Sequence, residues 1–188
     1  HVSARGAVEA ILAARAGGAP VTAEVTPHHL TLTHEAVAWL DGDGTLAYDT
    51  SAKVNPPLRT RDDVHACVAA LEAGGIDAIA TDHAPHASVE KDCEFDHAAF
   101  GISGLETALG LVLTLCHERR LDLRTVVAAL TVGPVRALGL DRFVPGLGTL
   151  RAGAPGDATI VDPDEEWVVD PAAFASKGKT TPLAGRTL

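Results

Sequence analysis

The sequence predicts an α/β fold, and more narrowly the C-terminal part of a parallel (β/α)8 barrel followed by a small β region. Helical and strand-like patterns alternate along most of the chain, which is typical of parallel βαβ units. Only two or three such units fit into 188 residues, whereas a complete barrel needs about 250 residues. The chain also contains no methionine, so we expect it to be a piece of a longer protein. An initiator removed after synthesis is the alternative explanation.

The first third of the chain predicts a helix, a strand and then a long polar segment. Residues 3–16 have a helical pattern that Ser3 can cap and that a glycine pair ends. Residues 21–26 are rich in β-branched side chains and lie between two prolines, which predicts a strand. A short helix is expected over residues 33–40, and a loop over residues 41–59.

The middle of the chain repeats the order of helix and strand. Thr60 and Asp63 form a capping box before an apolar repeat of helical spacing, which predicts a helix. Residues 76–81 predict the next strand, and residues 83–103 a polar loop that holds three histidines. Residues 104–120 then predict a helix.

The last part of the chain changes character. Residues 124–139 predict one or two helices, interrupted at Gly133-Pro134. Short β runs with glycine and proline turns follow. We therefore expect two regions, a barrel part over residues 1–143 and part of a small β domain over residues 144–188.

Composition excludes several classes of protein. The chain has 15 Lys and Arg against 25 Asp and Glu, a net charge of −10, and no basic stripe, which argues against nucleic acid as a partner. No apolar run is long enough to span a membrane. The three cysteines are far apart and form no CxxC pair, which fits the reducing cytoplasm better than a disulfide framework.

Polar residues gather where three strands are expected to end. In a parallel barrel, these ends face the active site. Imidazole and carboxylate groups together suit a divalent metal such as zinc. The three groups are His1; Thr26, His28 and His29; and Asp82, His83 and His86.

Each of these groups also has a plainer explanation. His1 can be a cap or a surface group, the pair His28-His29 can be a packed turn, and Asp82 can cap the next segment. Their occurrence at three successive strand ends makes coincidence less credible. A catalytic zinc normally has three protein ligands, so His1 and Asp82 supply two at most and the others must lie outside this chain.

Several motifs resemble the dihydroorotases of the bacterial, multidomain-like class, which belong to the amidohydrolase superfamily. The resemblance follows the family's order along essentially the whole chain and concerns only the C-terminal portion of those proteins. "TDHAPH" together with "NPPLR" is its most specific part. The matching stretches are "HVS" (1–3), "VTAEVTPHHL" (21–30), "KVNPPLR" (53–59), "IATDHAPH" (79–86), "FGISGLETAL" (100–109) and "GTLRAGAPGDATIVD" (148–162).

The resemblance implies a fold and a role for individual residues. It implies a metal-dependent (β/α)8 (TIM) barrel with part of a small β-sandwich at the C-terminal end. His1 and Asp82 match metal ligands, and Asp82 also matches the catalytic acid/base. The positions that match substrate-binding residues are Asn55, His86, Phe100 and Gly101.

The activity implied by the resemblance is the reversible cyclisation of N-carbamoyl-L-aspartate to L-dihydroorotate, a step of de novo pyrimidine (UMP) biosynthesis. A metal-activated hydroxide and the Asp82 acid/base would carry it out. The cofactor would be Zn²⁺, as one or two ions with the remaining ligands upstream of this chain. Loop 87–99 is polar and is expected to act as a lid. The resemblance implies a homodimer or a complex with aspartate transcarbamoylase as the expected assembly, in the cytoplasm.

Three alternatives remain open from the sequence. The first is another cyclic amidase: a dihydropyrimidinase, a hydantoinase or an allantoinase. The second is an inactive dihydroorotase-like partner of aspartate transcarbamoylase. The third is that the 188 residues alone are inactive, because an incomplete barrel leaves a sheet edge and core side chains exposed.

Overall fold

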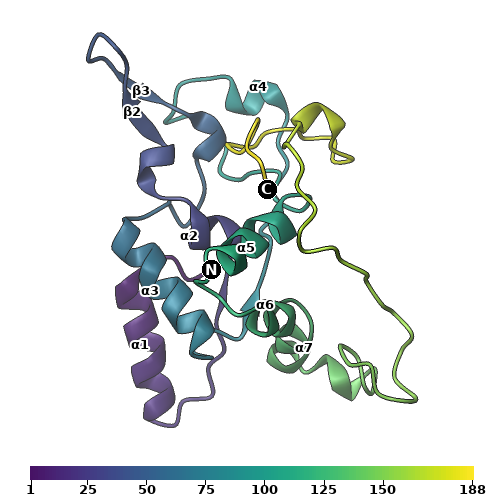
Figure 1. The fold of residues 1–188 in the computed structure, drawn as a ribbon. Helices are drawn as coiled ribbons and strands as arrows, with labels where there is room; N and C mark the ends of the chain where they lie inside the picture. Colours follow the sequence, from purple (N-terminus) through teal and green to yellow (C-terminus); the bar gives the residue numbers. More distant parts are fainter.

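The computed structural model describes all of residues 1–188 and confirms the α/β class (Figure 1). The α-helices are α1 (Arg5–Ala16), α2 (Pro27–Thr31), α3 (Arg61–Glu72), α4 (Ser88–Lys91), α5 (Ala108–His117), α6 (Leu123–Leu130) and α7 (Val132–Leu138). The strands are β1 (Glu24–Val25), β2 (Ala38–Leu40), β3 (Leu46–Tyr48) and β4 (Ala78–Ile79). Short 3-10 turns are η1 (His34–Ala36), η2 (Thr50–Ala52), η3 (Leu140–Arg142) and η4 (Pro171–Ala173). No helix combines the length and the apolarity needed to cross a bilayer.

A short parallel sheet positions the strand ends. β1 and β4 pair in parallel, with Glu24 opposite Ala78. The Val2 N–H donates to the Glu24 carbonyl at 2.9 Å. Successive carbonyls of a strand point to opposite sides, and the Val25 carbonyl accepts from Ala80 of the β4 segment. β1 therefore lies between the N-terminal residues and β4, and all three segments end at the same edge.

The two long helices beside this sheet are joined at their N-termini. The capping box expected at the start of α3 is present, with Thr60 and Asp63 bonding each other's backbone N–H groups. The expectation that Ser3 caps α1 is wrong, because the N-cap is Ala4 and no side chain of its own caps the helix. Instead, the Arg5 N–H donates to Asp63 Oδ1 at 2.9 Å. The Asp63 carboxylate thus accepts hydrogen bonds from backbone N–H groups at the start of both helices.

Only the single 3-10 turn η1 is helical within the expected short helix over residues 33–40, and Ala38–Leu40 forms the first strand of a β-hairpin. The second strand, β3, and the turn η2 lie in the expected loop 41–59. β2 pairs with β3 in antiparallel fashion, and Figure 1 shows the hairpin projecting from the body of the molecule. The acidic, glycine-rich turn between them provides the reason. The Asp41 N–H donates to the Thr45 carbonyl at 2.8 Å, and Gly44 has a φ of +84°. Trp39 and Tyr48 favour the strand conformation on either side.

Helices α6 and α7 confirm that residues 124–139 are helical, but the break lies at Thr131 rather than at Gly133-Pro134. Pro134 falls in the first turn of α7, where its missing N–H costs no hydrogen bond. A Cβ on Gly133 would lie 2.1 Å from the Asp77 carbonyl oxygen, so only glycine lets α7 pack this closely beside β4. Within the expected loop 83–103, the structure adds the single turn of α4.

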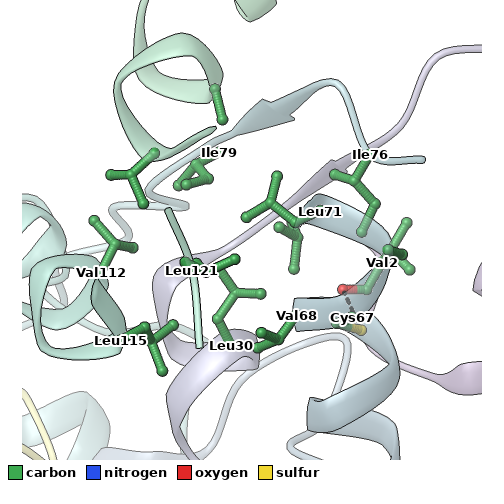
Figure 2. Packing of buried hydrophobic residues seen from close by; sticks show 14 of the residues in the cluster. Val2, Leu30, Cys67, Val68, Leu71, Ile76, Ile79, Val112, Leu115 and Leu121 are labelled. Carbon is green, nitrogen blue, oxygen red and sulfur yellow. Dashed lines mark hydrogen bonds between the residues drawn. The ribbon is translucent and has the colours of Figure 1, made fainter. Parts of the chain in front are cut away.

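The main core lies between the parallel sheet and helices α1, α3, α5 and α6. Figure 2 shows labelled aliphatic side chains of α2, α3, α5 and β4 packed together, with the Cys67 thiol near the Val2 carbonyl. The fully buried members contribute about 1.5–3 kcal/mol each relative to exposure. This cluster comprises Val2, Val8, Ala23, Val25, Leu30, Val64, Cys67, Val68, Ala70, Leu71, Ile76, Ile79, Val112, Leu115, Leu121, Val126 and Ala129.

Residues 144–188 contain one antiparallel bridge, between Val168 and Thr187, and no longer strand. The expected β-sandwich is not seen in this stretch, which Figure 1 shows as a long extended segment followed by short turns. Ile160 is 99% exposed and Leu150 is 90% exposed. A β run needs a partner strand for its N–H and C=O groups, and none of the chain's strands lies beside these residues. Further along, Phe174 packs into a second buried cluster with residues of η2 and α5.

Candidate active site

The strand ends bring His1 and Asp82 together. The His1 Nε2 atom lies 3.2 Å from Asp82 Oδ1, and both side chains are about one quarter exposed. His1 comes from the N-terminal segment on one side of β1, and Asp82 follows β4 on the other side. The two residues predicted as metal ligands therefore occupy one place at the edge of the sheet.

Glu24 completes this group, although it is not among the residues predicted from the sequence. Its Oε1 atom lies 2.5 Å from His1 Nδ1, and its Oε2 atom is buried without a hydrogen-bond partner. A carboxylate on Nδ1 holds the proton there and leaves the Nε2 lone pair free to face Asp82. The available signal was a single acid within the otherwise uncharged strand "VTAEVT".

Asp82 has an uncommon backbone conformation and a raised pKa. Its φ is +48°, a left-handed conformation that is uncommon outside glycine and is tolerated best by Asp and Asn. Burial raises the pKa of Asp82; the His29 ring opposes this rise, and the Glu24 carboxylate adds to it. The Asp82 carboxyl group therefore holds a proton more readily than an exposed aspartate does.

His1 and Asp82 fit a divalent cation as two of its ligands. Two ligands of a tetrahedral zinc at about 2.0 Å lie roughly 3.3 Å apart, close to the 3.2 Å between His1 Nε2 and Asp82 Oδ1. No three His, Cys, Asp or Glu side chains of this chain form a group that could hold a metal ion by themselves. The pair would thus provide part of a ligand set, and the orphaned Glu24 Oε2 belongs to the carboxylate that bonds His1.

His28 and His29 are buried in α2, which supports the explanation that they form a packed turn. His29 Nδ1 lies 2.7 Å from Thr26 Oγ1, and His29 Nε2 lies 2.8 Å from the Pro56 carbonyl oxygen. His29 therefore fastens the "NPPLR" segment to α2. His28 Nε2 has no partner, and burial lowers the pKa of His28 to about 3.

The structure also brings together three of the four predicted substrate residues. His86 Nε2 donates to the Phe100 carbonyl at 2.8 Å. Gly101 has a φ of +130°, and a Cβ there would lie 2.5 Å from the Ala84 Cβ and 3.2 Å from His86 Nε2. Only glycine allows this close approach. The fourth residue, Asn55, is exposed and makes no side-chain hydrogen bond.

His83 has a supporting role. Its Nδ1 accepts from the Leu105 N–H at 3.2 Å, and its Nε2 lies 3.5 Å from Ser176 Oγ. The ring therefore links the loop after β4 to the residues before α5 and to the C-terminal stretch.

Two buried lysines tie down the loop that was expected to act as a lid. Lys53 Nζ donates to the carbonyls of Phe95 and Asp96, at 2.7 and 3.0 Å. Lys91 Nζ donates to the carbonyls of Thr50 and Lys53, at 3.0 and 3.2 Å. Any opening of the loop would have to break these bonds.

Comparison with known proteins identifies the family. Residues 3–185 match the amidohydrolase family. The chain belongs to the amidohydrolase family. It is 54% identical over 188 residues to a dihydroorotase from Anaeromyxobacter sp. (strain K), and 53% identical over 189 residues to a dihydroorotase from Pelotomaculum thermopropionicum. Both comparisons cover the whole chain but only 41% of the relative, so this amidohydrolase chain spans about two fifths of their length. The resemblance predicted from the motifs is confirmed.

Solved structures agree with this assignment. The amidohydrolase chain superposes on an L-hydantoinase (dihydropyrimidinase) from Arthrobacter aurescens with a TM-score of 0.85 and 30% identity. A D-hydantoinase (dihydropyrimidinase) from a Thermus species gives the same TM-score at 24% identity, which supports the fold alone. Each match covers all of this chain and 40% of the solved one.

Proposed function

We propose that this chain is the C-terminal part of a dihydroorotase that interconverts N-carbamoyl-L-aspartate and L-dihydroorotate. The observation that carries the proposal is the meeting of His1 and Asp82 at the ends of neighbouring parallel segments. Identity of 54% to a dihydroorotase over the whole chain supports it.

The proposal includes a complete (β/α)8 barrel to which other parts of the protein contribute. The parallel pairing of β1 with β4, with Val2 bonded to the other side of β1, supports the barrel. Residues 144–188 would join a small β-sandwich, and exposed apolar side chains such as Ile160 would then gain partners. A cytoplasmic location, and assembly as a homodimer or with aspartate transcarbamoylase, belong to the same proposal.

The proposed cofactor is zinc, as one or two ions. His1 would bind it through Nε2 and Asp82 through its carboxylate, while Glu24 would orient the His1 ring through Nδ1. When bound, the metal would lower the pKa of a coordinated water to about 7 and polarise the substrate carbonyl. The remaining ligands would come from outside residues 1–188.

Asp82 would move the proton of the reaction. In the hydrolytic direction, it would accept the proton from the attacking water and deliver it to the ring nitrogen that leaves the opened amide. The place of Asp82 beside His1 suits both steps, because a bound cation would keep the carboxylate ionised until it accepts the proton.

His86, Asn55, Phe100 and Gly101 would bind the substrate. The His86 ring is fixed by its bond to the Phe100 carbonyl, and the Gly101 segment packs directly against it. Their fixed arrangement would orient the ring and its carboxylate beside Asp82, so less entropy is lost on binding. The exposed Asn55 side chain is free to reach the substrate.

A hydantoinase or dihydropyrimidinase activity is the second candidate, because the superposed solved structures carry those names. Assays of the full-length, metal-loaded protein on dihydroorotate, dihydrouracil, hydantoin and allantoin would separate the candidates. We expect kcat/KM to be highest for dihydroorotate by a factor of about 100 or more. A preference for any other ring would reject dihydroorotase in favour of that amidase. Failure on all four would favour an inactive partner of aspartate transcarbamoylase.

A further inference from the structure

The lysines of this chain are concentrated in one place. There are four, and Lys91, Lys177 and Lys179 line a single cavity. The fourth, Lys53, accepts a hydrogen bond from Lys91 Nζ through its carbonyl at 3.2 Å. The chain has a net charge of −10, so a cavity lined by three of its four lysines differs in charge from the molecule as a whole.

The lysine cavity has a volume of about 440 Å³ and lies between η2, α4 and the segment 177–181. Ten residues line it, and none of them is hydrophobic. Asp92 is the only carboxylate among them, against three ammonium groups. Both its size and its polar lining suit a small charged molecule.

The buried lysines form no close ion pair, although the more distant Asp49 carboxylate acts on Lys91. Lys91 is 3% exposed and Lys53 is 7% exposed, yet no lysine of the chain forms an ion pair with a carboxylate. Lys91 Nζ donates only to the carbonyls of Thr50 and Lys53. Burial, followed by the Lys53 charge, lowers the pKa of Lys91 to about 8. A buried cation is costly unless an anion accompanies it, so an anion in the cavity would relieve this cost.

Free donors face the same space. Lys177 is exposed, and no hydrogen bond involves its ammonium group. The hydroxyls of Ser51, Ser88 and Thr180 also line the cavity without a side-chain hydrogen-bond partner. Lys179 Nζ, in contrast, already donates to two backbone carbonyls. Several donors thus remain for one multiply charged ligand.

We propose that the lysine cavity binds a phosphate group, either as inorganic phosphate or as the phosphate of a small monoester. A phosphate carries close to two negative charges and several acceptor oxygens, which match the ammonium and hydroxyl donors. His86 is the one proposed substrate residue that also lines the cavity. Gly178 packs so closely against the His86 backbone that a Cβ at position 178 would lie 2.7 Å from the His86 backbone nitrogen. A bound phosphate would therefore sit next to the proposed substrate site without occupying the His1–Asp82 pair.

Calorimetric titration of the full-length metal-loaded protein tests the site. Inorganic phosphate and ribose 5-phosphate are added separately, at constant ionic strength, to wild type, Lys177→Ala, Lys177→Glu and the control Arg151→Ala. Arg151→Ala removes an exposed positive charge far along the chain from the cavity. We expect one saturable site, weakened about tenfold or more by Lys177→Ala, because a charged hydrogen bond to the phosphate is lost. Lys177→Glu should abolish binding, and the control should bind as the wild type does.

The two ligands identify the source of the phosphate. Binding of both, with loss in the Lys177 variants, supports a site for phosphate monoesters, and binding of inorganic phosphate alone supports a site for the free ion. Lys177 is exposed, so its replacement by alanine should leave the fold intact, and a circular-dichroism spectrum checks this. Absence of saturable binding up to about 10 mM, which corresponds to a very weak site, would overturn the proposal. Equal affinity in the wild type and both Lys177 variants would overturn it too.

Discussion

The two ends of the segment from Asp82 to Lys91 carry opposite charges. At the first end, the carboxylates of Asp82 and Glu24 share one imidazole, that of His1, so negative charge is in excess. At the other end, the Lys91 ammonium group donates only to backbone carbonyls and forms no ion pair with a carboxylate, in a cavity lined by three lysines and one aspartate. One short loop thus connects a place that a cation would stabilise with a place that an anion would stabilise.

Removing the charge of Asp82, at the first end of this segment, should have the largest effect, and the quantity it lowers is kcat. We expect Asp82→Asn to lower kcat roughly a hundredfold to ten-thousandfold, because an amide cannot carry the proton. His1 remains, so some metal should still bind. Steady-state assays with dihydroorotate and metal analysis measure both quantities. Asp141→Asn, an exposed acid in η3, is the matched control. Near-normal turnover of Asp82→Asn would remove the assigned role.

His86 lies between the two ends, and its loss should act on substrate binding. We expect His86→Ala to raise KM about 10- to 100-fold, because a hydrogen bond to a charged substrate group is lost. Initial rates over a range of dihydroorotate concentrations give the value. His97→Ala, an exposed histidine of the same loop, should leave KM unchanged. An unaltered KM in His86→Ala would exclude this residue from the substrate site.

Replacing Glu24 tests whether the orientation of the His1 ring contributes to metal affinity, because Glu24 bonds His1 and is not itself a proposed ligand. We expect Glu24→Gln to weaken metal binding by about tenfold, because the uncharged amide holds the His1 ring less firmly. Competition with a chromogenic chelator measures the metal affinity, and Glu94→Gln, at an exposed acid, provides the control. If Glu24→Gln binds metal as tightly as the wild type does, the carboxylate does not orient His1.

Replacing the buried His28 should have the smallest effect, and the quantity it changes is the dependence of stability on pH. The folded pKa of His28 is about 3, below its ordinary value of 6.5, so the unfolded chain binds the extra proton first. Stability should therefore fall as the pH drops through 6.5. Urea unfolding should show a loss of about 1 kcal/mol for this group between about pH 7 and about pH 5.5. His28→Leu should lack that part of the loss. An identical pH response in His28→Leu would show that His28 does not stay neutral in the folded state.

The helices and the strand ends could be predicted from the sequence, because local signals determine them. The capping box at Thr60 and Asp63 and the apolar periodicity of α1 and α3 require no distant partner. The order of strands and helices likewise placed His1 and Asp82 at one edge before their contact was known.

Features that depend on distant contacts could not be predicted. Asp63 caps α1 from 58 residues away, and nothing near Ser3 indicates this. The β2–β3 hairpin depends on pairing across its turn, which overrides the helical pattern of residues 33–40. Residues 144–188 show the opposite case, in which β-like sequences remain unpaired because no strand lies beside them. The roles of Glu24 and of the lysine cavity emerge only when separate segments meet.

Anomalous diffraction at the zinc edge from crystals of the metal-loaded full-length protein tests the central claim most directly. We expect a zinc ion at about 2.0–2.2 Å from both His1 Nε2 and an Asp82 carboxylate oxygen, with Glu24 still bonded to His1 Nδ1. A zinc ion bound elsewhere, with His1 and Asp82 bonded only to each other, would contradict it.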